Sequence, residues 1–442
     1  MRWNPGPDPR DEARAARWRE PVRLAWVHRS RRWSDADLEA FHERQLGAVL
    51  EQARRARLWA DRLPARLGPD RVTMEQFRTL DIVDKSVLLD AGSDARARPE
   101  RGAVRVPLWS SGSTGQHLAL EWSQTSAQWL GTHARAASLA RGIPLRRSSM
   151  WFRANARSSV GAGGPAVNRS PQELADEVAD TRPQLIGGLP HLLVEVGECL
   201  RGRHRPRWVV VGGETTDPAM RADLRRHFGC EPFDTYASIE VGNIAWQCRE
   251  RDLYHLNHTF VLTEVVDAAG VPVGPGGTGD VVVTGLAHPA TPLIRYRQGD
   301  RATLADRACR CGSELPALAR LDGRVHDWFL VPGGRVAPQR LYLSRHLDEP
   351  ARIARYRLQQ DGSGAVVLTY VTRDGRPLPE PVAERVRSSY EATLPGVPVS
   401  LQAVDEIPAS PSGKLEQLRS WAVEPMDRRR QAPGAGAVGS GR

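Results

Sequence analysis

The sequence predicts an α/β protein with two domains of unequal size. Its 442 residues exceed what one hydrophobic core usually supports, and an apolar fraction of 40% is enough to build two. Between residues 103 and 285, short runs of β-forming residues alternate with helical stretches, which is typical of an α/β domain. After residue 323 the pattern becomes that of a smaller α+β unit.

The expected elements follow one another along the chain. A helical opening region covers about 35–100, because Leu38, Phe41, Leu46 and Leu50 recur at helical spacing. Strands are then expected at 104–109, 208–211, 260–266 and 280–284, with helices at 125–141, 191–201 and 218–228. In the smaller unit we expect strands at 328–331, 365–371 and 399–404 and a helix at 381–394.

These elements give a large N-terminal domain at 1–323 and a small C-terminal α+β domain at 324–424. The tail 425–442 is rich in Arg, Gly, Ala and Pro and has little to bury, so we expect it to be disordered. No run approaches the 18 or more apolar residues of a membrane span, and the charged N-terminus has no apolar signal segment, so a cytoplasmic protein without membrane contact is expected.

The formal charge of +10 raises the question of nucleic-acid binding. The basic residues are spread along helical faces such as 51–66, which indicates a solvated surface and no nucleic-acid partner. Of 62 basic residues only Lys85 and Lys414 are lysine. Arginine and lysine are not interchangeable where a compact, mobile charge is needed, which makes Lys414 a candidate functional residue.

Three turns after predicted strands are candidate ligand-binding elements. The first is small and rich in hydroxyl groups, which suits polyphosphate oxygens; it consists of Ser110, Ser111, Gly112, Ser113, Thr114 and Gly115. The second, Gly212-Gly213-Glu214, ends a buried-type strand, where a flat base can lie on glycine backbone. The third offers Tyr236 for stacking on a purine and Glu240 for a Mg²⁺ ion. Ordinary turn and core roles explain each of them equally well when taken alone.

Together with a fourth segment, 279–300, these three turns form an ordered series of motifs. In order and spacing, the motifs resemble those of the ANL adenylating superfamily, and specifically those of the phenylacetate-CoA ligase family, over about residues 38–419. The matching motifs are Ser-Ser-Gly-Ser-Thr-Gly at 110–115, Gly-Gly-Glu at 212–214, the segment 236–240, Pro-Leu-Ile-Arg-Tyr-Arg-Gln-Gly-Asp at 292–300, the hinge signature Gly323-Arg324 with Asp327, and Ser-Gly-Lys at 412–414.

The resemblance implies the ANL fold, a large α/β domain with a small mobile α+β domain, and an enzyme that uses ATP and Mg²⁺. It implies that Asp300 binds the ribose hydroxyls with help from Arg324, and that Tyr236 stacks on adenine. It further implies that Glu240 coordinates Mg²⁺ and that Lys414 bridges the substrate carboxylate and the α-phosphate. Asp327 matches the hinge, and the apolar pocket is expected at Ala237, Ile239 and Val241.

The chain departs from the family pattern at three positions and in one segment. Gln116 stands where the family usually has lysine, Ile239 replaces a hydroxyl residue and Ala237 replaces a glycine. The segment 142–181 is shorter than in phenylacetate-CoA ligases, which argues against phenylacetate itself. Loss of one charge-assisted hydrogen bond costs about 1.5–3 kcal/mol, which slows a reaction without abolishing it.

Four residues have the spacing of a metal site. Cys248 and His255 form one short cluster and Cys309 and Cys311 another, around the strands expected between 260 and 300. Thiolates and an imidazole can close a tetrahedral structural Zn²⁺ site, with His258 as the competing ligand. The residues alone favour buried thiols, whereas some members of the family carry a metal at the matching positions, so a structural Zn²⁺ is expected.

The sequence therefore predicts an adenylate-forming ligase that activates an aromatic or compact carboxylic acid as acyl-AMP. The acceptor is expected to be CoA, a carrier-protein thiol or an amine, and the protein a monomer or homodimer. One alternative is ATP-dependent activation of another oxyanion, such as the nitrite used by diazotising relatives. The other is a catalytically degraded nucleotide-binding homologue, indicated by Gln116 and Ile239.

Overall fold

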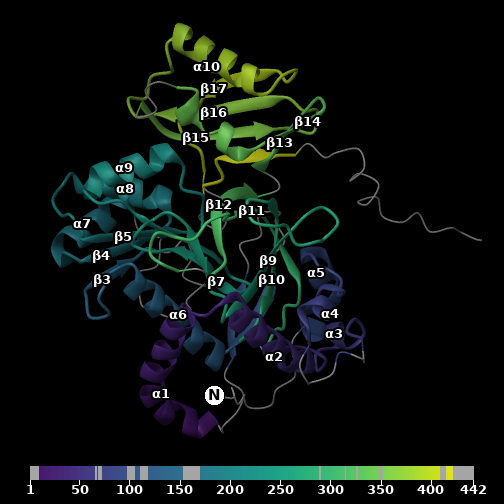
Figure 1. The fold of residues 1–442 in the computed structure, drawn as a ribbon. Coiled ribbons are helices and arrows are strands. Elements are labelled where there is room, and N and C mark those ends of the chain that lie inside the picture. Colours follow the sequence, from purple (N-terminus) through teal and green to yellow (C-terminus); the bar gives the residue numbers. More distant parts are fainter. Residues whose placement is uncertain are drawn as a thin grey trace, which may run out of the picture. The chain divides into compact units, whose positions relative to one another are not determined.

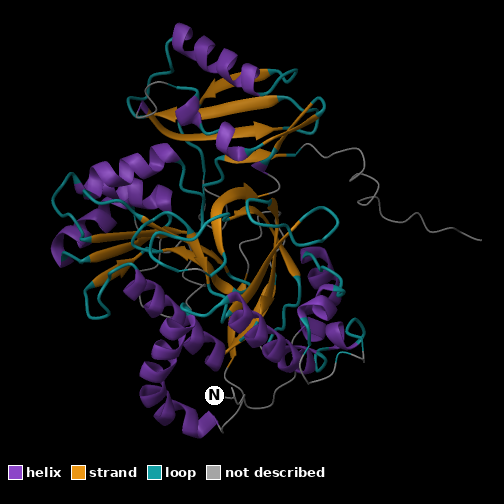
Figure 2. Ribbon diagram, viewed as in Figure 1, coloured by secondary structure: helices purple, strands orange, loops and turns teal. Residues whose placement is uncertain are grey.

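The computed structural model describes the chain in segments. These are residues 9–64, 67, 72–96, 105–109, 118–152, 170–287, 290–313, 315–324, 327–347, 352–408 and 415–421. The chain divides into two compact units, the first running to Leu321 and the second beginning at Asp322 (Figures 1 and 2). The predicted tail 425–442 lies outside the described residues.

Ten of the described strands form one mixed sheet in the first unit, in the order β3-β4-β5-β6-β7-β8-β12-β11-β10-β9. The strands are β3 (Ser149–Trp151), β4 (Leu185–Gly188), β5 (Trp208–Gly212), β6 (Phe233–Ser238), β7 (Gly242–Gln247), β8 (Tyr254–Leu256), β9 (Val261–Val266), β10 (Thr278–Gly285), β11 (Tyr296–Leu304) and β12 (Ala317–Arg324). Strands β3 to β6 run parallel, whereas β6–β7, β7–β8, β8–β12, β10–β11 and β9–β10 are antiparallel pairs.

Helices cover the parallel part of this sheet. They are α7 (Pro171–Thr181), α8 (Pro190–Leu200) and α9 (Pro218–Phe228), and each begins with proline in its first turn. Proline suits that position because its missing N–H would have no helical partner there. Ser170 and Glu173 form a capping box at α7, and Asp217 caps α9. The apolar faces of the three helices pack with β4 and β5 in one buried cluster.

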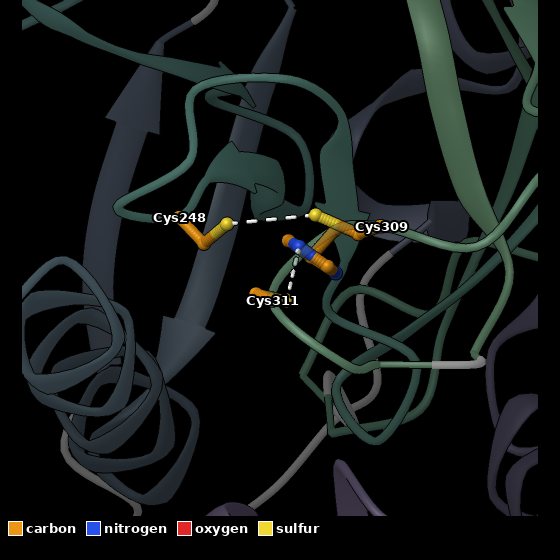
Figure 3. Close-up of side chains that lie close together, drawn as sticks. Cys248, Cys309 and Cys311 are labelled. Carbon is orange, nitrogen blue, oxygen red and sulfur yellow. Dashed lines mark hydrogen bonds between the residues drawn. The ribbon is translucent and has the colours of Figure 1, made fainter.

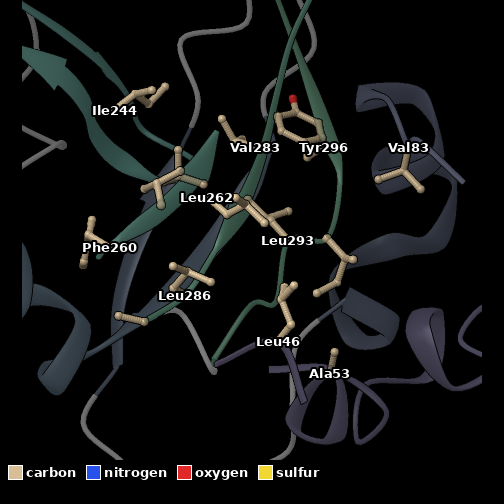
Figure 4. Packing of buried hydrophobic residues seen from close by; sticks show 14 of the residues in the cluster. Leu46, Ala53, Val83, Ile244, Phe260, Leu262, Val283, Leu286, Leu293 and Tyr296 are labelled. Carbon is tan, nitrogen blue, oxygen red and sulfur yellow. The ribbon is translucent and has the colours of Figure 1, made fainter. Parts of the chain in front are cut away.

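Six further helices and a β-hairpin belong to the described part of the first unit. They are α1 (Pro9–Ser30), α2 (Asp35–Ala53), α3 (Arg57–Ala60), α4 (Met74–Arg78), α5 (Lys85–Arg96) and α6 (Gln124–Ala140), with β1 (Arg105–Trp109) pairing antiparallel to β2 (Ala119–Ser123). Capping boxes at Ser34 and Thr73 begin α2 and α4. Leu46 and Ala53 of α2 belong to the same buried core as Leu262 and Val283 of the sheet (Figure 4).

The second unit is a small α+β structure. Its described elements are β13 (Phe329–Val331), β14 (Gly334–Val336), η2 (Pro338–Arg340), η3 (Leu343–Arg345), β15 (Ile353–Gln360), β16 (Val366–Thr372), α10 (Glu380–Thr393), β17 (Val399–Ala403) and β18 (Leu418–Ser420). Four of these strands form a sheet in the order β17-β16-β15-β18, and α10 packs into the core of this unit. Tyr390, fully buried, donates its hydroxyl to Leu341 O at 3.0 Å.

The α/β class is confirmed, and most predicted elements lie within a residue or two of their expected bounds. Helix α1 was not predicted, because Pro21 interrupts its sequence and its apolar residues do not form a clear stripe. Strands β3, β4, β8, β14 and β18, which have only three or four residues, were also missed, as were the longer β6, β7, β11, β12 and β15. Within the described residues, no helix combines the length and the apolar character that crossing a bilayer requires.

Candidate functional site

The carboxyl ends of three parallel strands bring several predicted residues to one edge of the sheet. Gly188 of β4 pairs with Val211 of β5, and Gly212 pairs with Thr235 of β6. Segments 189–191 and 213–215, which follow β4 and β5, therefore leave the sheet beside the end of β6, which carries residues 236–238 and is followed by the turn at 239–240. Ligands of open α/β sheets bind beyond such carboxyl ends.

The glycine pair of the second motif is required by the backbone. A Cβ on Gly212 would lie 2.6 Å from Thr235 O, closer than real Cβ contacts allow. Gly213 has φ +87°, a conformation that side chains with a Cβ rarely adopt. These constraints explain the glycines without a ligand, so binding of a base at this turn stays a prediction.

Tyr236 and Asp300 meet although they are 64 residues apart in the chain. Tyr236 Oη donates to Asp300 Oδ2 at 2.7 Å, and the tyrosine is 9% exposed. Tyr236 lies on β6 and Asp300 on β11. The structure thus joins the residue predicted to stack on adenine with the residue predicted to hold the ribose.

Glu240 lies in the turn between β6 and β7 and is half-buried. Its carboxylate has no hydrogen bond or ion pair with any residue in the described part of the chain. Of the residues predicted to line the acyl pocket, Ala237 and Ile239 are half-buried, whereas Val241 is completely buried in the main core. Their roles in binding Mg²⁺ and substrate stay predictions.

Glu214, predicted as a nucleotide-binding residue, bonds to a histidine that the sequence did not single out. The distance between His191 Nδ1 and Glu214 Oε2 is 2.7 Å, and the two side chains are 10% and 6% exposed. The pairing depends on the β4–β5 register, which sequence spacing does not reveal.

The hinge signature forms a local turn in the second unit. Asp327 Oδ2 accepts the backbone N–H of Arg324 at 2.8 Å, and Gly323, the residue before Arg324 at the end of β12, has φ +82°. Asp327 therefore fixes the conformation of the segment, and its action as a hinge stays a prediction. The phosphate turn 110–115, Gln116 and Lys414 lie outside the described residues.

The predicted metal ligands lie close together in the first unit. Cys248 follows β7, His255 lies on β8, and Cys309 and Cys311 lie in the loop between β11 and β12. Because β12 pairs with β8 through Ala317 and His255, this loop reaches the β7–β8 turn. The four ligand atoms all lie within 4.8 Å of one another, and the three cysteines converge in Figure 3.

Two of the distances between these atoms match those of a tetrahedral zinc ion. Zn–S bonds of about 2.3 Å and Zn–N bonds of about 2.05 Å at tetrahedral angles require S···S near 3.8 Å and S···N near 3.6 Å. Cys248 Sγ and Cys309 Sγ are 3.7 Å apart, and Cys311 Sγ and His255 Nε2 are 3.5 Å apart. His258 does not belong to the cluster; its Nδ1 lies 3.1 Å from Leu256 O instead.

Burial shifts the pKa values of Cys248, Cys309 and His255 in the direction that favours their neutral forms. Burial, together with the neighbouring thiols, raises the pKa of Cys248 to about 12. Burial and, to a smaller extent, Arg31 lower the pKa of His255 to about 4. Gly312, with φ +83°, donates its N–H to Cys309 O at 3.0 Å and turns the loop at the second ligand pair. A metal ion would have to displace thiol protons on binding.

Comparison with known proteins confirms the resemblance seen in the motifs. No protein-family model matches the sequence. The phenylacetate-coenzyme A ligase of Thermus thermophilus is 29% identical over 171 residues, 36% of this chain and 38% of that protein. The phenylacetate-coenzyme A ligase of Escherichia coli is 27% identical over 271 residues, 56% of this chain and 61% of that protein. The matches thus span less than two thirds of either relative.

Solved structures establish the fold. A 2-hydroxyisobutyryl-CoA ligase in the postadenylation state, in complex with 2-HIB-AMP, has a TM-score of 0.72 at 17% identity and covers 91% of this chain and 93% of its own. The amide bond synthetase McbA from Marinactinospora thermotolerans has a TM-score of 0.51 at 19% identity, covering 70% of this chain and 67% of its own. The predicted ANL adenylating-enzyme fold is confirmed.

Proposed function

We propose that this protein is an ATP-dependent, adenylate-forming ligase that activates a carboxylic acid as acyl-AMP and transfers the acyl group to a thiol or an amine. The observation that carries the proposal is the Tyr236–Asp300 hydrogen bond of 2.7 Å beside the carboxyl edge of the parallel strands. The similarity to phenylacetate-CoA ligases supports it. An aromatic or similarly compact acid is the substrate class we infer.

The reaction has two steps. In the first, a carboxylate oxygen of the acid attacks the α-phosphorus of ATP, and the bond to pyrophosphate breaks. In the second, the acceptor attacks the acyl carbon, and AMP leaves with the electrons of the C–O bond. The acyl-AMP must be kept from water between the two steps.

Each candidate residue has a role in this scheme. Asp300 would accept hydrogen bonds from the ribose hydroxyls while Tyr236, held by that same carboxylate, presents its ring to adenine. Glu240 supplies a carboxylate oxygen for Mg²⁺, the kind of ligand this ion prefers. Lys414 would neutralise the charge that develops between the attacking carboxylate and the α-phosphate.

Acid-dependent exchange of labelled pyrophosphate into ATP tests the proposal. We expect exchange with at least one member of a panel of aromatic and short-chain acids, and a large loss of exchange in Asp300→Asn. Asp61→Asn is the matched control, because Asp61 is exposed and far along the chain from the candidate site. Exchange driven by nitrite instead of any carboxylic acid would indicate the diazotising alternative.

We also propose that Cys248, His255, Cys309 and Cys311 hold a structural Zn²⁺. The match of the S···S and S···N distances to tetrahedral geometry supports this site. Metal analysis of the purified protein should give about one zinc per chain, consistent with a closed four-ligand site. Cys309→Ser should lose the zinc, while Cys199→Ser, a cysteine outside the cluster, should keep it.

A further inference from the structure

A buried acid–histidine pair lies next to the candidate nucleotide site. His191 is the second residue of α8, directly after the carboxyl end of β4, and Glu214 follows the carboxyl end of β5. Their contact of 2.7 Å joins two neighbouring segments of the ligand-binding edge. Glu214 also continues the Gly212-Gly213 turn, one strand away from Tyr236 on β6.

The geometry fixes which ring nitrogen faces Glu214. A carboxylate oxygen accepts only from a protonated nitrogen, so in the neutral imidazole the proton lies on Nδ1 and the lone pair on Nε2. Within the described ranges, Nε2 of His191 has no hydrogen-bond partner. A histidine fixed by a carboxylate through Nδ1, with Nε2 available, is the arrangement of a general base.

A purely structural role does not explain why this pair is buried. Burying an acid and an imidazole carries a desolvation cost that an apolar contact between α8 and the β5 turn would avoid. Elsewhere in the first unit, the buried polar groups of Arg295 and His204 bond to backbone carbonyls that need a donor. The His191–Glu214 contact joins two side chains.

We propose that His191 is the proton acceptor of the transfer half-reaction and that Glu214 is its positioning residue; this rests on the proposed function. His191 Nε2 takes the proton from the attacking N–H or S–H group. The electron pair of that nitrogen or sulfur forms the new bond to the acyl carbon, the C–O bond to phosphate breaks, and AMP leaves with its electrons. The imidazolium then releases the proton to water.

The two half-reactions allow the proposal to be tested on the full-length protein. Pyrophosphate exchange measures adenylation alone, using whichever acid of the panel supports it. The enzyme-bound acyl-AMP is then mixed with CoA or with benzylamine, and AMP release is followed in a single turnover between pH 5.5 and 9. The variants are His191→Asn, which keeps a group able to bond to Glu214, and Glu214→Gln.

We expect His191→Asn to slow transfer by about 10²- to 10⁴-fold, the usual contribution of a general base, with exchange changed by less than about threefold. The pH profile of the transfer rate between pH 5.5 and 9 should differ between the wild type and His191→Asn. Glu214→Gln should slow transfer less than His191→Asn does, because the imidazole is kept but is no longer held by a carboxylate. His28→Asn, an exposed histidine on α1, should match the wild type.

Three outcomes would overturn the inference. Unchanged transfer and an unchanged pH profile in His191→Asn, with exchange intact, would remove the role of the pair while leaving the ligase proposal in place. Loss of exchange and transfer together in both variants, with wild-type circular dichroism, would assign the pair to adenylation. Absence of exchange in the wild type with every acid would reject the ligase proposal and the inference with it.

Discussion

Lowering the pH from 7.5 to 5.5 is expected to destabilise the first unit, because three of its histidines are buried as neutral imidazoles. His42, His133 and His258 are 7%, 1% and 9% exposed. Burial is the main cause that lowers their pKa values, to about 4, 3 and 4 respectively. Their mutual repulsion adds to the shift, since His258 lowers the pKa of His133 and His42 lowers that of His258.

The direction of the effect follows from proton linkage. An unfolded histidine, with a pKa near 6.5, binds a proton at pH 5.5, whereas these folded histidines stay neutral. The unfolded state therefore binds more protons, and stability that is complete above about pH 6.5 is lost as the pH falls toward about 4. At pH 5.5 the loss is about 1.4 kcal/mol for each histidine, or ~4 kcal/mol for the three.

Urea unfolding followed by tryptophan fluorescence measures this loss. Trp33 lies 6.2 Å from the ring of His258, and Trp129 lies 6.3 Å from that of His133, so both indoles report on the region. Burial raises the pKa values of Asp234 and Glu264, and their titration acts in the opposite direction. The decisive comparison is therefore between the wild type and a histidine variant.

His133→Leu removes one buried imidazole whose Nδ1 has no partner among the described residues. When the pH is lowered from 7.5 to 5.5, the free energy of unfolding of this variant should fall by about 1.4 kcal/mol less than that of the wild type. The same comparison for His28→Asn should give no difference, because that side chain is exposed. Equal pH dependence in His133→Leu and the wild type would refute the reasoning.

Three further predictions concern the first unit. Gly242→Ala should lower the free energy of unfolding by about 2–4 kcal/mol in the urea assay, because its φ is +77° and a Cβ would lie 2.8 Å from Trp122. Gly142→Ala is the control: its φ is +74°, but a Cβ there would meet open space, so the cost should be about 1 kcal/mol. Arg295→Leu should cost about 3–5 kcal/mol, because buried Glu264 would keep only its 3.9 Å contact with Arg78, and the Glu264→Gln variant of that protein should recover part of the loss. Treatment with a strong chelator should lower the melting temperature of the wild type and leave Cys309→Ser unchanged; equal shifts in both proteins would argue against a structural zinc.

The sequence predicted those parts of the fold that local pattern controls. Helices α8 and α9 and strand β10 were placed within two residues, since apolar periodicity and proline in the first helical turn are visible in the chain. Strand β4 was missed because half of its four residues are glycine. Its glycines fit the close approach of Trp151 and Phe152, a tertiary contact that no local pattern contains.

Site residues that belong to a recognisable motif were predicted from the sequence. Residues that only the register of the strands brings together were missed. The motifs predicted Tyr236 and Asp300 as site residues, and in the structure a hydrogen bond connects them. The spacing of the cysteines predicted the metal cluster. The geometry of this cluster depends on the pairing of β8 with β12. His191 has no motif of its own, and only the parallel register of β4 and β5 brings it to Glu214.

The formation of an acyl-adenylate tests the central claim most directly. The purified protein is incubated with ATP, Mg²⁺ and a mixed pool of carboxylic acids without any acceptor, and the bound products are released and identified by mass spectrometry. The account predicts one dominant acyl-AMP and an equal amount of pyrophosphate, both strongly reduced in Asp300→Asn. Release of pyrophosphate without any acyl-AMP, or no turnover of ATP with any acid in the pool, would contradict it.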